Sequence, residues 1–397
     1  MAIWRHMNNR LQLSGGSRRL PGGLCRQLRL LLPLLALVLL ASCGRGVRHE
    51  SWPGLSAVDG TLYVANLEQV QAINSETGKV YWGFPSDDDR DPGPFYSTPV
   101  LAPEHGDHGL LLIAGFSDQT VYALALGASP TERPDEAWRF AGASGQYVGT
   151  GTVVEDLFII GNGDGRVYAI NLEDGTGAWQ FATQDRVWAT PVVIGETVYV
   201  ASLDHHLYAL DLQTGSERWR LETEGALAAT PVVADGDLWI GDFAQNLYRV
   251  DPEGGEVIWT FEARDWLWST PLVDDTIMYF ADVGGNVYAL DVESQTLIWD
   301  EPVSIGDVVR GRPALNEDGS LLYVAGHETG RLRAIDTSSG ALRESWGTTP
   351  ENPGRLPGDL LVDDERLYAM PILVSERVQA YGLADGELLW SSPQGTD

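Results

Sequence analysis

Histidine and carboxylate residues that could bind a metal or transfer protons gather in three short stretches of this 397-residue sequence. Residues 104–108 (EHGDH) could share a metal ion, and residues 87–91 (DDDRD) offer the oxygen ligands that Ca²⁺ prefers. His205 and His206 are adjacent, so in a strand their side chains would point to opposite sides. All three stretches fall in expected loops or turns, without a second cluster to complete a coordination shell. We interpret them as solvated surface residues.

Two other patterns resemble functional motifs only superficially. Residues 161–165 (GNGDG) are rich in glycine, but they join two expected strands and precede no helix whose N-terminus would hold a phosphate. No arrangement of Ser, His and Asp stands out as a nucleophile with its base. The sequence therefore predicts no catalytic residue and no metal site.

Eight tryptophans close copies of one short phrase, whose clearest example is residues 209–219 (ALDLQTGSERW). They are Trp82, Trp138, Trp179, Trp219, Trp259, Trp299, Trp346 and Trp390. Their spacings are 56, 41, 40, 40, 40, 47 and 44 residues. A period near 40 residues indicates that one supersecondary unit is repeated along the chain.

Each repeat predicts four short strands. In the repeat that ends at Trp219, alternating or β-branched residues predict strands at 188–193, 197–202, 207–211 and 216–221. A single four-stranded sheet leaves two edges open, whereas radial repetition covers its faces and protects its edges. The predicted fold is therefore all-β, an eight-bladed β-propeller of four-stranded antiparallel blades. Both terminal repeats contain four expected strands, so the ring needs no blade shared between the termini.

The phrase Ala-x-Asp-x-x-Thr-Gly-x-x-x-Trp resembles the tryptophan-docking motif of the pyrroloquinoline quinone (PQQ) repeat family, over residues 52–391. This resemblance implies that the eight tryptophans are structural and that each packs between neighbouring blades. The fourth copy matches the motif fully and the first nearly so, whereas later copies depart further from it. The fifth has Arg249 for Ala, the sixth has Gln295 for Gly, and the seventh lengthens the spacing from Gly340 to Trp346 by two residues.

The first 42 residues resemble a bacterial lipoprotein signal peptide. Six arginines and no acidic residue accompany an apolar run, 30–40, that is too short for a comfortable membrane span. The run leads to Leu-Ala-Ser-Cys43, which resembles a lipobox and implies that Cys43 is diacylated and becomes the mature N-terminus. An ordinary secretory signal with an incidental cysteine is the alternative.

These features divide the chain into a signal peptide (1–42), a lipidated N-terminus with a short tether (43–51) and a propeller (52–397). The seven residues from Gly44 to Glu50 reach only about 23 Å at about 3.3 Å each, so we expect the propeller close to the bilayer. Gly44 after the cysteine resembles an outer-membrane sorting context. The expected location is the outer membrane, facing the periplasm, in a two-membrane bacterium, and otherwise the outer face of the cell membrane.

The family name suggests a quinoprotein enzyme, yet the resemblance to such enzymes is poor outside the blades. They are considerably longer, and the alcohol dehydrogenases among them typically stack the quinone on a disulfide between adjacent cysteines. The two cysteines here are Cys25, in the expected signal peptide, and Cys43, assigned to lipid. We therefore expect no PQQ and no enzymatic activity; a PQQ-dependent oxidoreductase is the alternative.

The charge of the chain excludes one class of partner. Six of the 26 basic residues and none of the 56 acidic ones precede Cys43, so the mature chain keeps 20 basic residues and a net charge of −36. Such a surface does not bind nucleic acid through phosphates, and anionic lipid repels it. The lipid anchor, not electrostatic attraction, is expected to hold it at the membrane.

Alignment of the copies reveals a partly aromatic column at the start of the innermost strands. It comprises Trp52, Tyr96, Val148, Trp188, Ala228, Trp268, Arg310 and Pro357, with Trp266 beside it. The aromatic members could take a peptide strand or a protein loop, or they could only cap the inner ends of the blades. The candidate partner-binding residues are Trp52, Tyr96, Trp188, Trp266, Trp268 and Arg310.

Unusually long connections point to the same face as this column. Residues 86–94 and 348–357 both join an outer strand to the next inner strand and are expected beside the column, since long loops on one face of a repeat array often mark its binding face. A second pair, 104–109 and 127–136, is expected on the opposite face.

The lipid-anchored propeller as a whole resembles the BamB family of outer-membrane assembly lipoproteins, which scaffold the machinery that folds β-barrels. This resemblance implies a non-enzymatic envelope scaffold, as a monomer or part of a hetero-complex, whose partner is an envelope protein such as the β-barrel assembly machinery. A surface receptor for peptide or glycan is a further alternative.

Overall fold

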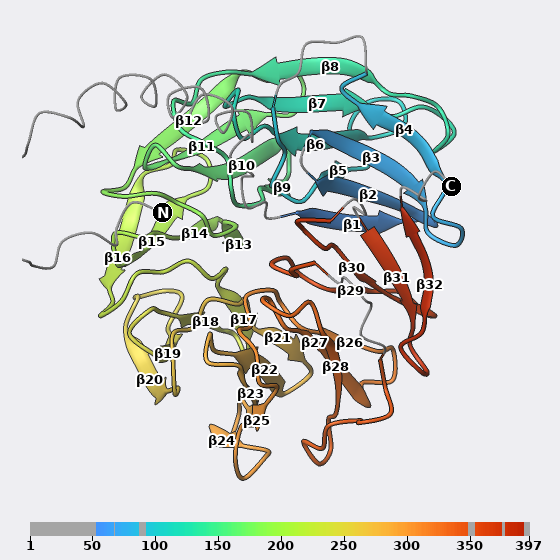
Figure 1. Ribbon diagram of the computed structural model, residues 1–397. Helices are drawn as coiled ribbons and strands as arrows, with labels where there is room; N and C mark the ends of the chain where they lie inside the picture. Colours follow the sequence, from blue (N-terminus) through green and yellow to red (C-terminus); the bar gives the residue numbers. More distant parts are fainter. Residues whose placement is uncertain (1–52, 67, 87–92, 348–353, 375–377, 393–397) are drawn as a thin grey trace, which may run out of the picture. The chain divides into compact units, whose positions relative to one another are not determined.

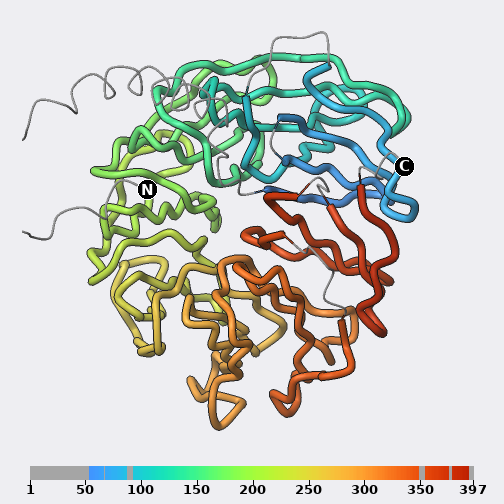
Figure 2. Tube along the Cα trace, viewed as in Figure 1, coloured from blue at the N-terminus to red at the C-terminus, as the bar shows by residue number. Residues whose placement is uncertain are grey.

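The computed structural model describes residues 53–66, 68–86, 93–347, 354–374 and 378–392. The expected signal peptide, Cys43, Trp52 and the acidic stretch 87–91 lie outside these residues. The described residues form eight antiparallel sheets that follow one another round a ring in chain order (Figures 1 and 2). This confirms the predicted all-β, eight-bladed propeller. In this part of the chain, no helix has the length and apolar character that crossing a membrane requires.

The strands of each sheet follow chain order from the ring's centre outward. Blades one to four comprise β1 (Gly54–Val58), β2 (Thr61–Asn66), β3 (Gln69–Asn74), β4 (Val80–Phe84); β5 (Val100–Ala102), β6 (Leu110–Ala114), β7 (Val121–Ala125), β8 (Asp135–Phe140); β9 (Thr152–Val154), β10 (Leu157–Asn162), β11 (Arg166–Asn171), β12 (Gly177–Ala182); and β13 (Val192–Ile194), β14 (Thr197–Ala201), β15 (His206–Asp211), β16 (Glu217–Glu222).

Blades five to eight comprise β17 (Val232–Ala234), β18 (Asp237–Gly241), β19 (Asn246–Val250), β20 (Val257–Glu262); β21 (Leu272–Asp274), β22 (Ile277–Ala281), β23 (Asn286–Asp291), β24 (Thr296–Leu297), β25 (Val303–Ser304); β26 (Ala314–Leu315), β27 (Leu321–Ala325), β28 (Leu332–Asp336); and β29 (Leu361–Val362), β30 (Arg366–Ala369), β31 (Val378–Gly382), β32 (Leu388–Ser392). Between neighbouring blades the buried side chains form separate apolar clusters, so each blade is covered by the next.

Two blades depart from the predicted four strands, and one expected strand is shorter. In blade six the outer strand is divided into β24 and β25, which pair with opposite ends of β23. Blade seven has three strands, because the longer Gly340–Trp346 segment makes only an isolated bridge between Ile335 and Leu342. The innermost strand expected at 188–193 is β13, Val192–Ile194, since Pro191 cannot donate a ladder hydrogen bond.

The ring closes between two complete blades. All strands of the first blade come from the N-terminal side and all strands of the eighth from the C-terminal side, so no blade is shared. The indole of Trp390 and the hydroxyl of Tyr368 in blade eight both donate hydrogen bonds to the carbonyl of Ser75 in blade one, each at 3.2 Å. Closure therefore repeats the contact that joins the other blades.

That contact is a hydrogen bond from a repeat tryptophan to the next blade. Seven of the eight indole nitrogens donate to a backbone carbonyl there: Trp82 to Pro130, Trp138 to Leu172, Trp179 to Leu212, Trp219 to Pro252, Trp299 to Thr337, Trp346 to Leu383 and Trp390 to Ser75, at 2.7–3.2 Å. The ring also lies against the motif glycine of that blade; for example, a Cβ on Gly215 would lie 2.5 Å from Trp179. Only glycine leaves room for the indole.

The interface between blades five and six uses a different donor. The carbonyl of Val292, equivalent to those that accept an indole elsewhere, accepts a hydrogen bond from Arg249 Nη1 at 3.1 Å. Arg249 is also ion-paired with Asp235 and Asp237. Gln295 occupies the position that glycine holds in most copies, with a φ of 58°. The two departures from the motif thus lie at one interface, where Arg249 provides the hydrogen bond that a tryptophan provides in the others.

We expect Gly215→Ala to destabilise the propeller more than Gly195→Ala. Both glycines have positive φ, 68° and 56°, so each substitution costs about 1–2 kcal/mol in backbone strain. Only at Gly215 would the new methyl group also meet an indole, which adds about 1–3 kcal/mol; at Gly195 nothing lies within 4 Å. Denaturant unfolding of the two variants checks this, and equal losses would show that the glycine–indole contact is not close.

Arg249→Ala restores the motif residue, yet we expect it to lower the free energy of unfolding by about 2–3 kcal/mol. It leaves the mostly buried Asp237 and the Val292 carbonyl without their donor. The double variant Arg249→Ala/Gln295→Gly should recover part of the loss, because glycine gives Trp259 room to dock as the other tryptophans do. Thermal melting of both variants tests this; an Arg249→Ala protein as stable as the wild type would contradict it.

Candidate functional site

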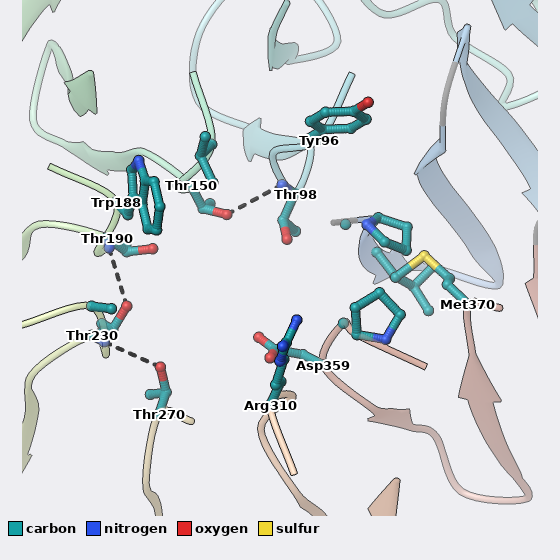
Figure 3. Close-up of a pocket in the computed structure, with 18 of the residues that line it drawn as sticks. Tyr96, Thr98, Thr150, Trp188, Thr190, Thr230, Thr270, Arg310, Asp359 and Met370 are labelled. Carbon is teal, nitrogen blue, oxygen red and sulfur yellow. Dashed lines mark hydrogen bonds between the residues drawn. The ribbon is translucent and has the colours of Figure 1, made fainter. Parts of the chain in front are cut away.

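The inner strands begin around a central cavity of about 150 Å³ (Figure 3). All seven described members of the predicted column line it: Tyr96, Val148, Trp188, Ala228, Trp268, Arg310 and Pro357. The eighth member, Trp52, lies outside the described residues, but Pro53 and Gly54 directly after it also line the cavity. The tertiary structure thus brings together, in one place, positions about 40 residues apart in sequence.

A ring of threonines below the column joins neighbouring blades. The hydroxyl oxygens of Thr150, Thr230 and Thr270 accept hydrogen bonds from the backbone N–H groups of Thr98, Thr190 and Thr230, at 3.1–3.2 Å (Figure 3). At the equivalent position of blade eight, a carboxylate oxygen of Asp359 accepts the N–H of Arg312 at 2.8 Å. The Thr-Pro pairs of the repeats therefore have a structural role at the ring's inner edge.

Four aromatic side chains form a continuous row of ring contacts beside the cavity, which we call the aromatic cluster: Trp188, Trp268, Phe243 and Trp266. Trp188 lies 6.3 Å from Trp268, and Phe243 stacks on Trp268 and Trp266 at 5.1 and 5.5 Å between ring centroids. The guanidinium of Arg310 lies 5.4 Å from the Trp268 ring, within cation–π range. Trp266 is 49% exposed, and the other three rings are partly exposed.

The column alignment could not find Phe243, because it follows the second strand of its blade and not the fourth. Antiparallel order explains why it meets the column. An inner strand begins on the face where the second strand ends, so the β18–β19 turn with Phe243 lies on the same face as Trp266 and Trp268, which precede β21. We call this the aromatic face.

Tyr96 is placed differently from the other aromatic candidates. It is 2% exposed and packs on Phe116, 4.4 Å away, and burial raises the pKa of its hydroxyl to about 12. Tyr96 therefore stays neutral and offers little surface to a partner. In its case the geometry fits the capping alternative better than the binding one.

A buried histidine lies next to the cavity wall in blade seven. His327 is 1% exposed, and neither of its ring nitrogens is hydrogen-bonded to a described residue. Its backbone is fixed by hydrogen bonds to Val308 and Leu356. Burial lowers the pKa of the imidazole, and nearby Arg310 lowers it further. The folded protein therefore favours neutral His327.

The opposite face carries a larger groove, of about 910 Å³, between blades two and three. Glu104, His105 and Asp107 from the long 104–109 connection line it, and the Nε2 atom of His105 lies 3.3 Å from Asp156 of the next blade. Within the described ranges, no group of three or more His, Cys, Asp or Glu side chains is placed to hold a metal ion. His206 instead stacks on Tyr208 within its own blade.

A comparison with known protein families shows the family to which the repeats of this chain belong. The family described as outer membrane protein assembly factor BamB matches residues 117–229, 207–351 and 284–397, which together span well over half of the chain. The chain belongs to the BamB family. No curated protein matches it in sequence.

Solved structures resemble this BamB-family propeller in fold. The crystal structure of BamB from Moraxella catarrhalis is similar with a TM-score of 0.61 and 17% identity, over 80% of this chain and 92% of that one. A computationally designed protein, Ika8, is similar with a TM-score of 0.66 and 12% identity, over 85% and 98%. At these identities the likeness concerns the fold alone.

The central cavity does not fit the quinone after which the repeat is named. Ligand pockets generally begin at about 300 Å³, and this cavity holds about 150 Å³. Among the described residues its lining also offers a single cation, Arg310, which is engaged with the Trp268 ring. We derive no chemistry through PQQ for this BamB-family chain.

We expect His327 to make the propeller less stable in mild acid. Because its folded pKa is below the unfolded value, only the unfolded chain gains a proton as the pH falls through the ordinary histidine range, near 6.5, and stability is lost there. Above that range the residue contributes no pH dependence. Denaturant unfolding at pH 7 and pH 5 should show a larger loss for the wild type than for His327→Gln. An equal loss in both proteins would contradict this assignment.

Proposed function

We propose that this BamB-family protein is a non-enzymatic, lipid-anchored scaffold of the cell envelope, which binds a protein partner through its aromatic face. Family membership supports the scaffold role. The observation that carries the binding site is the aromatic cluster, a continuous row of contacting rings beside a cavity in which Arg310 is the only cation among the described lining residues. Large aromatic and arginine side chains in partly desolvated pockets supply most of the energy of protein interfaces.

The partner we propose is the β-barrel assembly machinery, in a cell that has one. The solved relative from Moraxella catarrhalis is named for the same family. The proposed anchor is diacylated Cys43 after removal of residues 1–42, which places the propeller at the outer membrane, facing the periplasm, in a two-membrane cell. The net charge of the mature chain, −36, makes nucleic acid an unsuitable partner.

Within this site, Trp266 is the most informative residue to change. Trp188 and Trp268 are more enclosed and pack on other rings, so truncating them would also cost stability. Trp266 exposes half of its surface and contacts Phe243 on one side. Its truncation should weaken binding with little effect on the fold.

We expect Trp266→Ala to reduce capture of a β-barrel assembly component by at least about tenfold, as for a typical interface hot spot. Ile258→Ala is the matched control, because Ile258 on outer strand β20 is equally exposed, at 50%. The measurement is a pull-down with the full chain from detergent-solubilised envelopes, read with antibodies to the assembly components.

Circular dichroism melting of both variants accompanies the pull-down. Capture by Ile258→Ala equal to wild type, with loss in Trp266→Ala at an unchanged melting temperature, supports the site. Capture undiminished in Trp266→Ala would remove the aromatic cluster from the interface. Failure of the wild type to recover any assembly component would count against the proposed partner.

A further inference from the structure

The face opposite the aromatic cluster is lined with exposed carboxylates. Each of the eight turns that join a first strand to a second lies there and carries at least one acidic residue whose side chain is exposed. One from each blade is Asp59, Glu104, Glu155, Glu196, Asp235, Asp275, Glu317 and Asp364. We call this the acidic face.

Aspartates on the aromatic face are turned inward instead. In blades two to six, an aspartate after the second strand accepts a hydrogen bond from a tyrosine hydroxyl of the third strand: Asp118 from Tyr122, Asp164 from Tyr168, Asp204 from Tyr208, Asp242 from Tyr248 and Asp282 from Tyr288. Exposed carboxylates are also present on this face, such as Asp185, Glu224, Glu301 and Glu328, and exposed Arg186 and Arg264 accompany them. Among the described residues, negative charge is therefore concentrated on the acidic face.

The chain enters the propeller on the aromatic face. Pro53, the first described residue, lines the central cavity together with Trp188 and Trp268. Cys43 precedes it by ten residues, which span at most about 36 Å at about 3.6 Å per residue. A lipid on Cys43 therefore tethers the aromatic face and not the acidic one.

A tether of that length is poorly suited to present the acidic face to the bilayer. The four strands of a blade spread over about 14 Å at about 4.8 Å apart, and a six-residue strand is about 20 Å long. A path from the cavity across a blade and down its outer edge is thus about 34 Å before side chains and loops are counted, which already takes up nearly the whole extended tether. Anionic lipid would also repel the acidic face.

We infer that the aromatic face is turned toward the membrane, and that the partner it fits is the membrane-proximal part of an integral membrane protein. The inference rests on the lipid anchor of the proposed function. It adds an orientation: the acidic face points away from the membrane. The partner contacts the aromatic cluster within about 36 Å of the bilayer.

The shape of the site favours protein over lipid as the occupant. Three of the four rings are recessed beside a cavity, and Trp266 alone exposes about half of its surface. Charged groups flank it, because Arg264 is ion-paired with Glu301 and Asp265 precedes it in sequence. A protruding loop can enter such a recess and pair with its charges, whereas a bilayer surface cannot.

Single cysteines at the two ends of one inner strand can measure the orientation. Asp185→Cys lies on the aromatic face and Glu196→Cys on the acidic face, both exposed and both removing one negative charge. They flank β13, and lipidation would leave no other free thiol in the mature chain. The lipidated protein is reconstituted in vesicles of phosphatidylethanolamine with a minority of phosphatidylglycerol. A fluorophore on each introduced cysteine is then quenched by headgroup spin-labelled lipid.

Stronger quenching at position 185 than at 196 is the expected result. Equal quenching at the two positions, or stronger quenching at 196, overturns the orientation. Cys43→Ser should abolish vesicle binding; if wild type itself does not bind, or Cys43→Ser binds equally, the anchor of the proposed function fails instead.

Photo-cross-linking in whole envelopes tests the partner. A benzophenone attached to the thiol of the Asp185→Cys variant should cross-link to an integral membrane protein at least several-fold more than one attached to the Glu196→Cys variant does. Cross-links only to lipid from position 185, together with quenching of Trp266 fluorescence by acyl-chain-brominated lipid that Trp266→Ala abolishes, would identify the bilayer as the occupant and overturn the partner assignment.

Discussion

The hydrogen bond from a repeat tryptophan to the next blade is the interaction on which the rest of this structure depends. A single four-stranded blade exposes both faces, and the indole that packs on a glycine of its neighbour covers one of them while satisfying a backbone carbonyl. The same bond joins blade eight to blade one through Trp390 and Ser75. Closure therefore needs neither a shared strand nor a disulfide, and the ring tolerates one substituted interface, where Arg249 donates in place of an indole.

The tryptophan contacts between blades involve the outer strands, and the threonine hydrogen bonds lie at the inner edge of the ring. The turns on the two faces take no part in these contacts, so their sequences can differ from blade to blade. On one face the turns carry exposed carboxylates. On the other, rings from separate blades meet around the cavity: Trp188 from the connection into blade four, Phe243 from blade five and Trp268 from the connection into blade six. A symmetrical scaffold thus carries an asymmetric surface, and its single tethered end lies on the aromatic side.

Aligning the repeats predicted some residues of the candidate site and not others. In a closed ring, the residues at the start of every inner strand lie near the centre. The residues of the column that line the cavity could therefore be predicted from the repeat spacing alone. Phe243 could not be, because it belongs to a different turn and approaches Trp268 only when two blades pack. Alignment also could not separate buried Tyr96 from exposed Trp266, since exposure depends on neighbours such as Phe116 that lie elsewhere in the chain. Asp359 replaces a threonine and still accepts the inter-blade bond, which only the folded structure reveals.

The sequence by itself determined the number of blades, their antiparallel strands and the residues that join most of them, because a 40-residue period and, in most copies, a motif glycine that faces an indole are local requirements repeated along the chain. It also showed two departures from the motif, the lengthened spacing before Trp346 and Gln295, but it predicted four strands in blades six and seven as in the others. Tertiary structure alone decided which side chains are exposed at the cavity, that Arg249 takes over at the Gln295 interface, and that His327 is buried without a hydrogen-bond partner among the described residues. Those outcomes depend on contacts between residues from different blades, which no local pattern encodes.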